Sequence, residues 1–228
     1  MQLFQSTTII DHASVNHFIE QYARQDNWHE IDKTSGNLGY GWIHYALIRI
    51  LKPERVLCIG SRYGFIPAIC ALACRDNKKG IVDFVDANYD QNDPEHNTKL
   101  GGKHDTHWGG VGFWTPEHVK NHFHKFKLNE HIRMTVATSR DFHRMNPTQT
   151  WQYIHLDGDH SYQGIKTDVC RFFPKLTSGG MLTLHDIRTK HAGGLTYGVW
   201  QLWREMKAGK QYNCIELPGS FGLGLTQK

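Results

Sequence analysis

The chain has 228 residues, of which 39% are hydrophobic, 12% aromatic and 21% charged, and its formal net charge is +4. This composition is ordinary for a globular domain and excludes a disordered chain, while the mild charge gives no sign of a nucleic-acid partner. No apolar run approaches the about 20 residues that span a membrane, and residues 1–6 lack the pattern of a secretory signal. We therefore expect a single domain that acts on a small molecule, without a nucleic-acid or membrane partner. Whether it forms a homo-oligomer is left open.

The cysteines indicate a reducing environment. They form an odd set, and most of them lie inside apolar strand or helix patterns, which is typical of buried reduced thiols. The five residues are Cys58, Cys70, Cys74, Cys170 and Cys214. A cytoplasmic location is the resulting prediction.

Residues 1–50 are predicted to form a helical lid or packing segment ahead of the catalytic part, 51–228, of one domain. A helix is predicted from Trp42 to Leu51, ending before Pro53 as helices tend to do. An earlier helix is indicated by apolar residues spaced along one helical face, namely Val15, Phe18, Ile19 and Tyr22.

From residue 55 onward, short β-branched runs alternate with helical patterns. The predicted strands are 55–59, 81–85, 132–137, 153–156 and 181–184, and the predicted helices are 65–74, 118–126, 165–176 and 199–206. Such alternation implies βαβ units and a mostly parallel sheet. The last two runs, 212–217 and 221–226, predict a hairpin that closes the sheet with an antiparallel pair.

The segment from Asn88 to Thr115 has no apolar period and is rich in Gly, His, Asp and Asn. A loop of this length is usually functional or disordered. His104 and His107 in the loop are conceivable metal ligands. A second possible set is His118, His122 and His124, of which the first two lie one helical turn apart. We expect them instead to lie on solvated surfaces, because no second ligand cluster is in evident reach.

A glycine turn follows the first predicted strand. Gly60 and Gly64 flank Ser61-Arg62-Tyr63, in a spacing that lacks the second and third glycines of the dinucleotide fingerprint. Glycines here let a ligand approach the backbone, and Asp86, at the end of the second strand, is suited to accept both hydroxyls of an adenosine ribose. The alternative is a plain turn between strand and helix.

Two polar clusters follow the fourth and fifth predicted strands: Asp157-Gly158-Asp159-His160 and His185-Asp186. Because the carboxyl ends of parallel strands line one crevice, both clusters should face the same mouth. Asp157, His185 and Asp186 could then hold a divalent ion, with oxygen ligands suiting Mg²⁺ or Mn²⁺. The alternative is that Asp159 caps the next helix and His185 packs against its neighbour, with no metal.

The order of these motifs resembles the metal-dependent class I O-methyltransferases related to those acting on sugars in macrolide and aminocoumarin antibiotic biosynthesis. The resemblance runs from about Arg55 to Ile187 and is most specific at Leu156–Tyr162 and Leu184-His185-Asp186. It implies an α/β, Rossmann-like class I methyltransferase fold with a seven-stranded, mostly parallel sheet in the order 3-2-1-4-5-7-6 and helices on both faces. It also implies S-adenosylmethionine as cofactor. Its expected contacts are Gly60, Ser61, Tyr63, Gly64, Asp86, Ala87, Ser139 and Asp157.

The resemblance further implies metal ligation by Asp157, His185 and Asp186, and a general-base role for His160, with Asp157 also in the catalytic set. The chain departs from the group in two places. Cys58 stands where class I enzymes usually carry an acidic residue, and His185 replaces a carboxylate, which would favour Mn²⁺ or another transition metal over Mg²⁺.

The expected reaction is methylation of a hydroxyl group on a small molecule, in which the metal orients the acceptor and His160 takes its proton. His160 could instead only hydrogen-bond the loop. Two other functions stay open at this stage: a metal-assisted hydrolase that uses the Asp157, His160, His185 and Asp186 cluster, and a cofactor-binding protein without catalysis.

Overall fold

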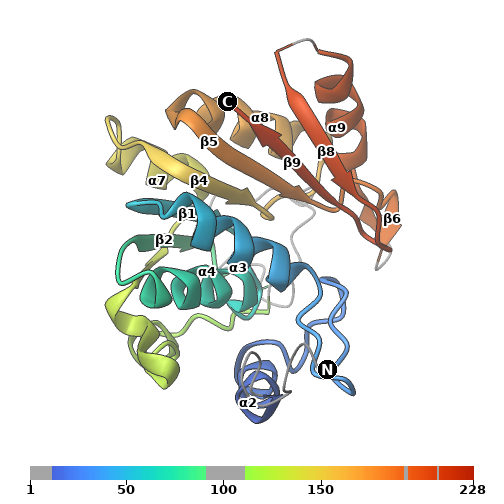
Figure 1. The fold of residues 1–228 in the computed structure, drawn as a ribbon. Helices are drawn as coiled ribbons and strands as arrows, with labels where there is room; N and C mark the ends of the chain where they lie inside the picture. The colour runs from blue at the N-terminus through green and yellow to red at the C-terminus, as the bar shows by residue number, and fades with distance from the viewer. Residues whose placement is uncertain (1–11, 91–110, 193–194, 210) are drawn as a thin grey trace, which may run out of the picture.

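A seven-stranded sheet forms the centre of the computed structural model, which describes residues 12–90, 111–192, 195–209 and 211–228 (Figure 1). Its strands are β1 Arg55–Ile59, β2 Ile81–Asp86, β3 Ile132–Val136, β4 Trp151–Leu156, β5 Leu176–His185, β8 Asn213–Leu217 and β9 Leu223–Gln227. Their order is β3-β2-β1-β4-β5-β9-β8. The first five are parallel, and β9 runs antiparallel to both β5 and β8.

Counted within this sheet alone, the order is 3-2-1-4-5-7-6, so the predicted topology is confirmed. One small element was not predicted. The two-residue strands β6 His191–Ala192 and β7 Leu195–Thr196 pair as a separate hairpin between β5 and the last helix.

Helices cover both faces of the sheet (Figure 1). They are α2 His12–Tyr22, α3 Tyr40–Leu51, α4 Phe65–Asp76, α6 Pro116–Asn121, α7 Ser139–Met145, α8 Tyr162–Phe172 and α9 Val199–Ala208, with short 3₁₀ helices η1 Lys125–Glu130 and η2 Phe173–Lys175. Successive side chains of strand β1 point to opposite faces of the sheet. Val56 and Cys58 pack with α4 on one face. Leu57 and Ile59 pack with α8 and α9 on the other. Both faces of the parallel strands are therefore buried.

The N-terminal helix α2 belongs to the first of these cores. Phe18, Ile19 and Tyr22 are buried in the same cluster as α4. The Tyr22 ring stacks on Phe123 at a centroid distance of 5.9 Å, and its hydroxyl donates to the carbonyl of Lys125 at 3.2 Å. Helix α2 is thus packed against α4 and the segment around η1. The function of the N-terminal segment as a lid stays a prediction.

Two predicted segments differ in the structure. The helix expected over 118–126 is divided, because α6 ends at Asn121 and Phe126 and Lys127, inside η1, adopt left-handed φ angles of 60° and 57°. The polar loop 88–115 contributes a core residue, since Trp114 is only 3% exposed and its backbone N–H donates to Asn88 Oδ1 at 2.7 Å. His104 and His107 lie outside the described residues.

The cysteines follow the prediction only in part. Cys58, Cys70 and Cys74 are buried, but Cys170 is exposed on α8 and Cys214 is half-buried on the edge strand β8; all five are free thiols. Among the described residues, no helix is long and apolar enough to cross a bilayer.

Candidate active site

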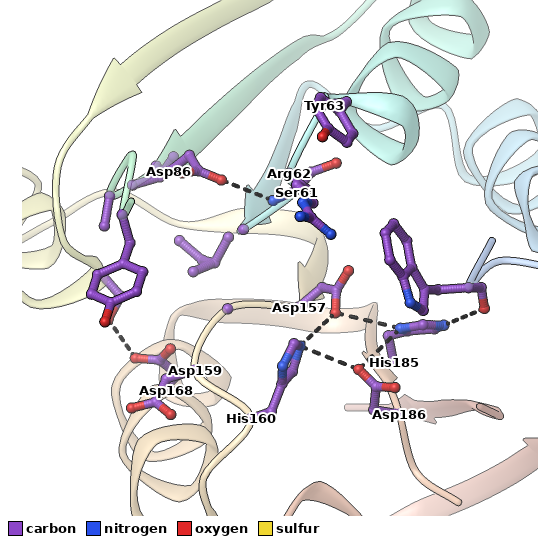
Figure 2. A pocket seen from close by; sticks show the side chains of 18 of the residues that line it. Ser61, Arg62, Tyr63, Asp86, Asp157, Asp159, His160, Asp168, His185 and Asp186 are labelled. Carbon is purple, nitrogen blue, oxygen red and sulfur yellow. Dashed lines mark hydrogen bonds and ion pairs between the residues drawn. The ribbon is translucent and has the colours of Figure 1, made fainter. Parts of the chain in front are cut away.

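The carboxyl ends of β1, β4 and β5 meet at one edge of the sheet. Ile59 pairs with Leu156, and Leu156 pairs with Leu184, so Asp157 and His185 follow neighbouring strands at the same level. A cavity of about 350 Å³ opens at this edge (Figure 2). The predicted convergence of the two polar clusters on one mouth is confirmed.

The glycine turn after β1 lies directly against the loop after β4. Gly60 has φ +76°, and a Cβ atom at this position would collide with the carbonyl of Asp157. The backbone N–H of Asp157 donates to the Ile59 carbonyl at 2.8 Å, which ties the two loops together. Only glycine permits both the left-handed φ angle and this close approach.

The predicted cofactor residues line the cavity with one exception. Gly60, Ser61, Tyr63, Asp86, Ala87, Ser139 and Asp157 all contribute to its wall. Gly64 is not part of the lining. It is the N-cap of α4 with φ +81°, and it faces the rings of Trp114 and Phe123. The left-handed φ angle at the start of α4 explains why this residue is a glycine. The structure does not support a direct contact between Gly64 and the cofactor.

Asp86, the last residue of β2, hydrogen-bonds to the glycine turn. Its Oδ2 accepts the N–H of Ser61 at 3.1 Å (Figure 2). Its Oδ1 accepts the N–H of Asn88 at 2.7 Å. Burial raises the pKa of Asp86 to about 6. Each carboxylate oxygen keeps a further lone pair, so the side chain can accept two hydroxyl groups of a ligand.

Sequence reasoning missed a further carboxylate on the cavity wall. Asp168 lies in α8, only 4% exposed, and accepts a hydrogen bond from the Ser139 hydroxyl at 2.6 Å. Burial raises its pKa to about 6. The sequence feature that could have revealed Asp168 is its place on the apolar face of α8, next to the buried Val169.

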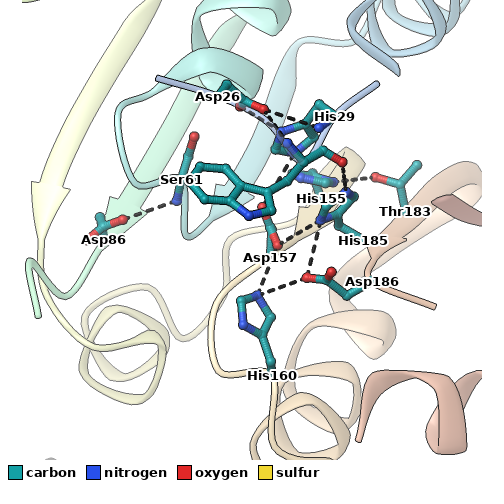
Figure 3. Close-up of polar contacts among 11 residues, drawn as sticks. Asp26, His29, Ser61, Asp86, His155, Asp157, His160, Thr183, His185 and Asp186 are labelled. Carbon is teal, nitrogen blue, oxygen red and sulfur yellow. Dashed lines mark hydrogen bonds and ion pairs between the residues drawn. The ribbon is translucent and has the colours of Figure 1, made fainter. Parts of the chain in front are cut away.

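Four side chains form a compact cluster at the ends of β4 and β5 (Figure 3). His160 Nε2 lies 3.2 Å from both Asp157 Oδ1 and Asp186 Oδ2. His185 Nδ1 lies 3.4 Å and 3.3 Å from the same two oxygens. All four residues have little exposed surface, and the cluster unites the predicted ligands Asp157, His185 and Asp186 with the predicted base His160.

The backbone explains why two consecutive residues can face this cluster. Side chains of successive strand residues normally point to opposite faces of a sheet. Asp186 follows the last residue of β5 with φ +61°, in the left-handed region, where Asp is several-fold enriched over most residues. The chain therefore turns at this point, and both His185 and Asp186 reach Asp157 and His160.

The charges of the cluster are mutually balanced. Burial alone would raise the pKa of Asp157, but His185, His160 and His29 hold it well below its ordinary value. Burial alone would lower the pKa of His185, but Asp186 and Asp157 raise it well above its ordinary value. The carboxylates are therefore ionised, and a divalent cation between them would replace the protons held by the histidines.

The N-terminal segment adds a residue pair that sequence reasoning did not single out. His29 is buried, with Nε2 3.6 Å from Asp157 Oδ2, and its Nδ1 lies 2.7 Å from Asp26 Oδ2 (Figure 3). Against the effect of burial, Asp26 raises the pKa of His29. The Asp-x-x-His spacing was the only local signal, since the partner Asp157 is far away in the sequence.

The remaining polar residues have structural explanations. Ser161, rather than Asp159, caps α8, because its hydroxyl accepts the N–H of Gly164 at 3.0 Å; Asp159 instead accepts the N–H of Ser161 at 2.9 Å. The expectation that His122 is solvated is wrong. Its ring packs edge-on against Trp114, and its Nε2–H donates to the Tyr63 carbonyl at 3.0 Å. Burial accordingly lowers the pKa of His122 to about 4.

Comparison with known families decides the class of this site. Residues 57–187, more than half of the chain, match a family described as a methyltransferase domain. The chain belongs to this methyltransferase domain family. The matched part begins in β1 and ends just after Asp186, so it contains both the glycine turn and the carboxylate–histidine cluster.

Solved structures of methyltransferases share the fold. An O-methyltransferase from Bacillus cereus in complex with S-adenosylhomocysteine is 12% identical with a TM-score of 0.62, covering 97% of this chain and 93% of that one. A methyltransferase from Podospora anserina with bound S-adenosylhomocysteine is 13% identical with a TM-score of 0.61, covering 96% and 88%. The O-methyltransferase TomG from Streptomyces achromogenes, in complex with S-adenosylmethionine, is 12% identical with a TM-score of 0.56, covering 97% and 92%.

An uncharacterised protein of Sinorhizobium fredii is 25% identical over 202 residues, which is 86% of this chain. The chain spans 20% of the length of that relative.

Within the methyltransferase domain, the departure at Cys58 has a structural consequence. Cys58 has no exposed surface and its Sγ lies 3.9 Å from the Sγ of Cys70, beneath α4. A thiol at this position packs in the core. It cannot reach the amino group of a methionine moiety in the cavity. Other acidic residues that line the cavity include Asp26 and Asp157.

Proposed function

We propose that this methyltransferase domain transfers the methyl group of S-adenosylmethionine to a hydroxyl oxygen of a small molecule, with a divalent metal ion bound at Asp157, His185 and Asp186. The single observation that carries the proposal is the position of Asp157. Its backbone touches the glycine turn, and its carboxylate belongs to the histidine cluster. The cofactor at the glycine turn and the acceptor at the metal would therefore both lie next to Asp157.

The cofactor half of the proposal is supported by the cavity wall. Gly60 and Ser61 leave the backbone accessible, and Asp86 has free acceptor capacity for two ribose hydroxyls. The absence of the dinucleotide glycine spacing argues against a pyrophosphate ligand. Two of the solved structures that share the fold contain S-adenosylhomocysteine, which supports the same choice.

The metal half is supported by the donor atoms. Two ionised carboxylates and two imidazoles approach one another within hydrogen-bonding distance, and none of the four side chains is substantially exposed. Carboxylate oxygens suit Mg²⁺ and Mn²⁺, whereas imidazole nitrogens shift the preference toward transition metals. When bound, such an ion would orient the acceptor hydroxyl and lower its pKa.

His160 is placed to take the acceptor proton. Its Nε2 faces the two carboxylates, and its ring stacks on Tyr197 at a centroid distance of 4.6 Å, which fixes its orientation. Its Nδ1 is buried and has no hydrogen-bond partner within the described ranges. Asp186 and Asp157 raise the pKa of His160 against the effect of burial, so the ring is a strong proton acceptor once neutral.

The experiment that tests the proposal is methyl transfer from isotope-labelled S-adenosylmethionine to a panel of hydroxylated small molecules, with Mn²⁺ or with a chelator. Label in a new O–CH₃ group, dependent on the metal, supports it. Cofactor binding without transfer to any acceptor would favour the non-catalytic alternative. Label on nitrogen or carbon would contradict the proposed acceptor. The family match argues against the hydrolase alternative, because the chain belongs to the methyltransferase domain family.

A further inference from the structure

The cluster has a neighbour that neither the family match nor the sequence motifs include. His29 precedes the matched region 57–187 and comes from the segment between α2 and α3. It is 5% exposed and has its Nε2 turned toward Asp157 Oδ2 at 3.6 Å, outside hydrogen-bonding distance. This buried nitrogen has no hydrogen-bond partner in the described part of the chain. A buried polar atom without a partner calls for an explanation.

The orientation of His29 is fixed from its other side. Asp26 Oδ2 lies 2.7 Å from His29 Nδ1, so the proton of a neutral ring resides on Nδ1 and the lone pair resides on Nε2. Asp26 is itself held, because its Oδ1 accepts the backbone N–H groups of Trp28 and His29 at 3.0 Å and 3.1 Å. A carboxylate behind an imidazole is the usual arrangement around a metal-ligating histidine.

The same segment orients the second imidazole of the cluster. The Trp28 carbonyl accepts a hydrogen bond from His185 Nε2 at 3.1 Å, which leaves the Nδ1 lone pair of a neutral His185 facing Asp157 and Asp186. The rings of His29 and His185 stack at a centroid distance of 4.3 Å and an interplanar angle of 22°. Donor atoms of His29, Asp157 and His185 all lie within 4.8 Å of one another.

We infer that His29, oriented by Asp26, is a further ligand of the divalent ion, and that the site is a centre of two histidines and two carboxylates for a transition metal. This inference rests on the proposed metal site at Asp157. Two imidazoles with their second nitrogens tied to Asp26 and to the Trp28 carbonyl form a preorganised donor pair. Imidazole ligands suit first-row transition metals, whereas Mg²⁺ prefers oxygen ligands and retains water. The ion would also anchor the segment that carries Asp26 to the catalytic strands.

The test uses the full chain with Mn²⁺ and Mg²⁺ as probes and the variants His29→Ala, Asp26→Asn and His17→Ala. His17 is an exposed histidine of α2 and serves as the matched control. Mn²⁺ affinity is measured by titration, and pulsed electron paramagnetic resonance detects the nitrogen nuclei bound to Mn²⁺. The dissociation constant of S-adenosylhomocysteine, measured in parallel, reports whether each variant is folded.

For His29→Ala we expect Mn²⁺ affinity to fall about tenfold or more and one coupled nitrogen to disappear, and for Asp26→Asn a smaller loss of affinity in the same direction. Mg²⁺ affinity and S-adenosylhomocysteine affinity should change little, and His17→Ala should match the wild type. Should His29→Ala fail to fold, wild-type Mn²⁺ affinity in Asp26→Asn overturns the inference.

Two results separate failure of the inference from failure of the proposed function. Unchanged Mn²⁺ affinity and nitrogen count in His29→Ala, in a protein where Asp186→Asn does lose Mn²⁺, would remove His29 from the site and leave the metal in place. A wild-type chain that binds S-adenosylhomocysteine but neither metal would remove the metal altogether. The cofactor assignment would survive both results.

Discussion

Gly60 and Asp157 are in direct backbone contact across the carboxyl ends of β1 and β4. The space that a side chain would occupy at Gly60 is filled by the carbonyl of Asp157, and the N–H of Asp157 donates to Ile59. In the proposed function, the glycine that leaves the backbone open to the cofactor is therefore also the residue that lets the Asp157 loop lie close to β1. A substitution at Gly60 should therefore alter both the glycine turn and the histidine cluster.

Gly60→Ala should damage folding and binding together. Gly179→Ala is a matched control, because Gly179 has nearly the same φ angle, +75° against +76°, and nothing within 4 Å of its Cβ position. The left-handed conformation alone costs about 1–2 kcal/mol for an alanine. We expect urea unfolding to show that loss in Gly179→Ala and a larger loss, of about 3 kcal/mol or more, in Gly60→Ala. Equal losses in the two variants would contradict the contact.

The affinity for S-adenosylhomocysteine should depend on pH through Asp86. A ribose hydroxyl donates to the ionised carboxylate, so a proton on Asp86 competes with the ligand. With a pKa of about 6, the carboxylate is mostly ionised at pH 7.5 and mostly protonated at pH 5. Calorimetric titration should show affinity falling by about tenfold between pH 7.5 and pH 5. Asp86→Asn should bind weakly and should lose the part of this pH dependence that comes from Asp86.

Asp186→Asn should weaken the metal site without disturbing the cofactor site. The carboxylate of Asp186 lies in the cluster, whereas the glycine turn and Asp86 belong to other strands. We expect Mn²⁺ affinity to fall by about tenfold or more while S-adenosylhomocysteine affinity stays near the wild-type value. Asp159→Asn is the control, because Asp159 lines the same cavity but is held by the N–H of Ser161 outside the cluster. Retained Mn²⁺ affinity in Asp186→Asn would exclude this carboxylate as a ligand.

His160→Ala should affect turnover more than binding. If His160 removes the acceptor proton, kcat should fall by about 10² to 10⁴ with little change in cofactor affinity. The acid limb of the wild-type pH profile should disappear in the variant, since the group whose neutral form is required is then absent. Wild-type kcat and an unchanged acid limb in the variant would mean that another group of the cavity removes the proton. Asp159 would be the next candidate.

The sequence was most informative where function follows directly from local chain order. Asp157, His160, His185 and Asp186 come immediately after apolar strands, and parallel pairing necessarily brings the ends of neighbouring strands together. The same rule located Asp86 beside the glycine turn. The strand order followed from the family resemblance, because alternation of strands and helices predicts a parallel sheet but does not order its strands.

The features that were missed depend on contacts between distant segments. His29 meets Asp157 across more than a hundred residues, and the polar segment around it has no periodicity that would predict its place. Trp114 is a core residue inside a stretch of polar composition, because the glycine turn leaves a space beside Gly64 that its ring fills. Asp168 turns toward the cavity from a helix face that is otherwise apolar. Such residues are found only when the packing is known.

The central claim is that the cavity at the glycine turn and Asp86 holds S-adenosylmethionine, and thermal unfolding with its product tests this most directly. S-adenosylhomocysteine at about 100 times its Kd should stabilise the fold by about 2.7 kcal/mol, which raises Tm by about 5 to 11 °C for a domain of this size. NAD at the same concentration should leave Tm nearly unchanged, because the turn lacks the glycine spacing for a pyrophosphate. A clear rise in Tm with NAD and none with S-adenosylhomocysteine would contradict the account.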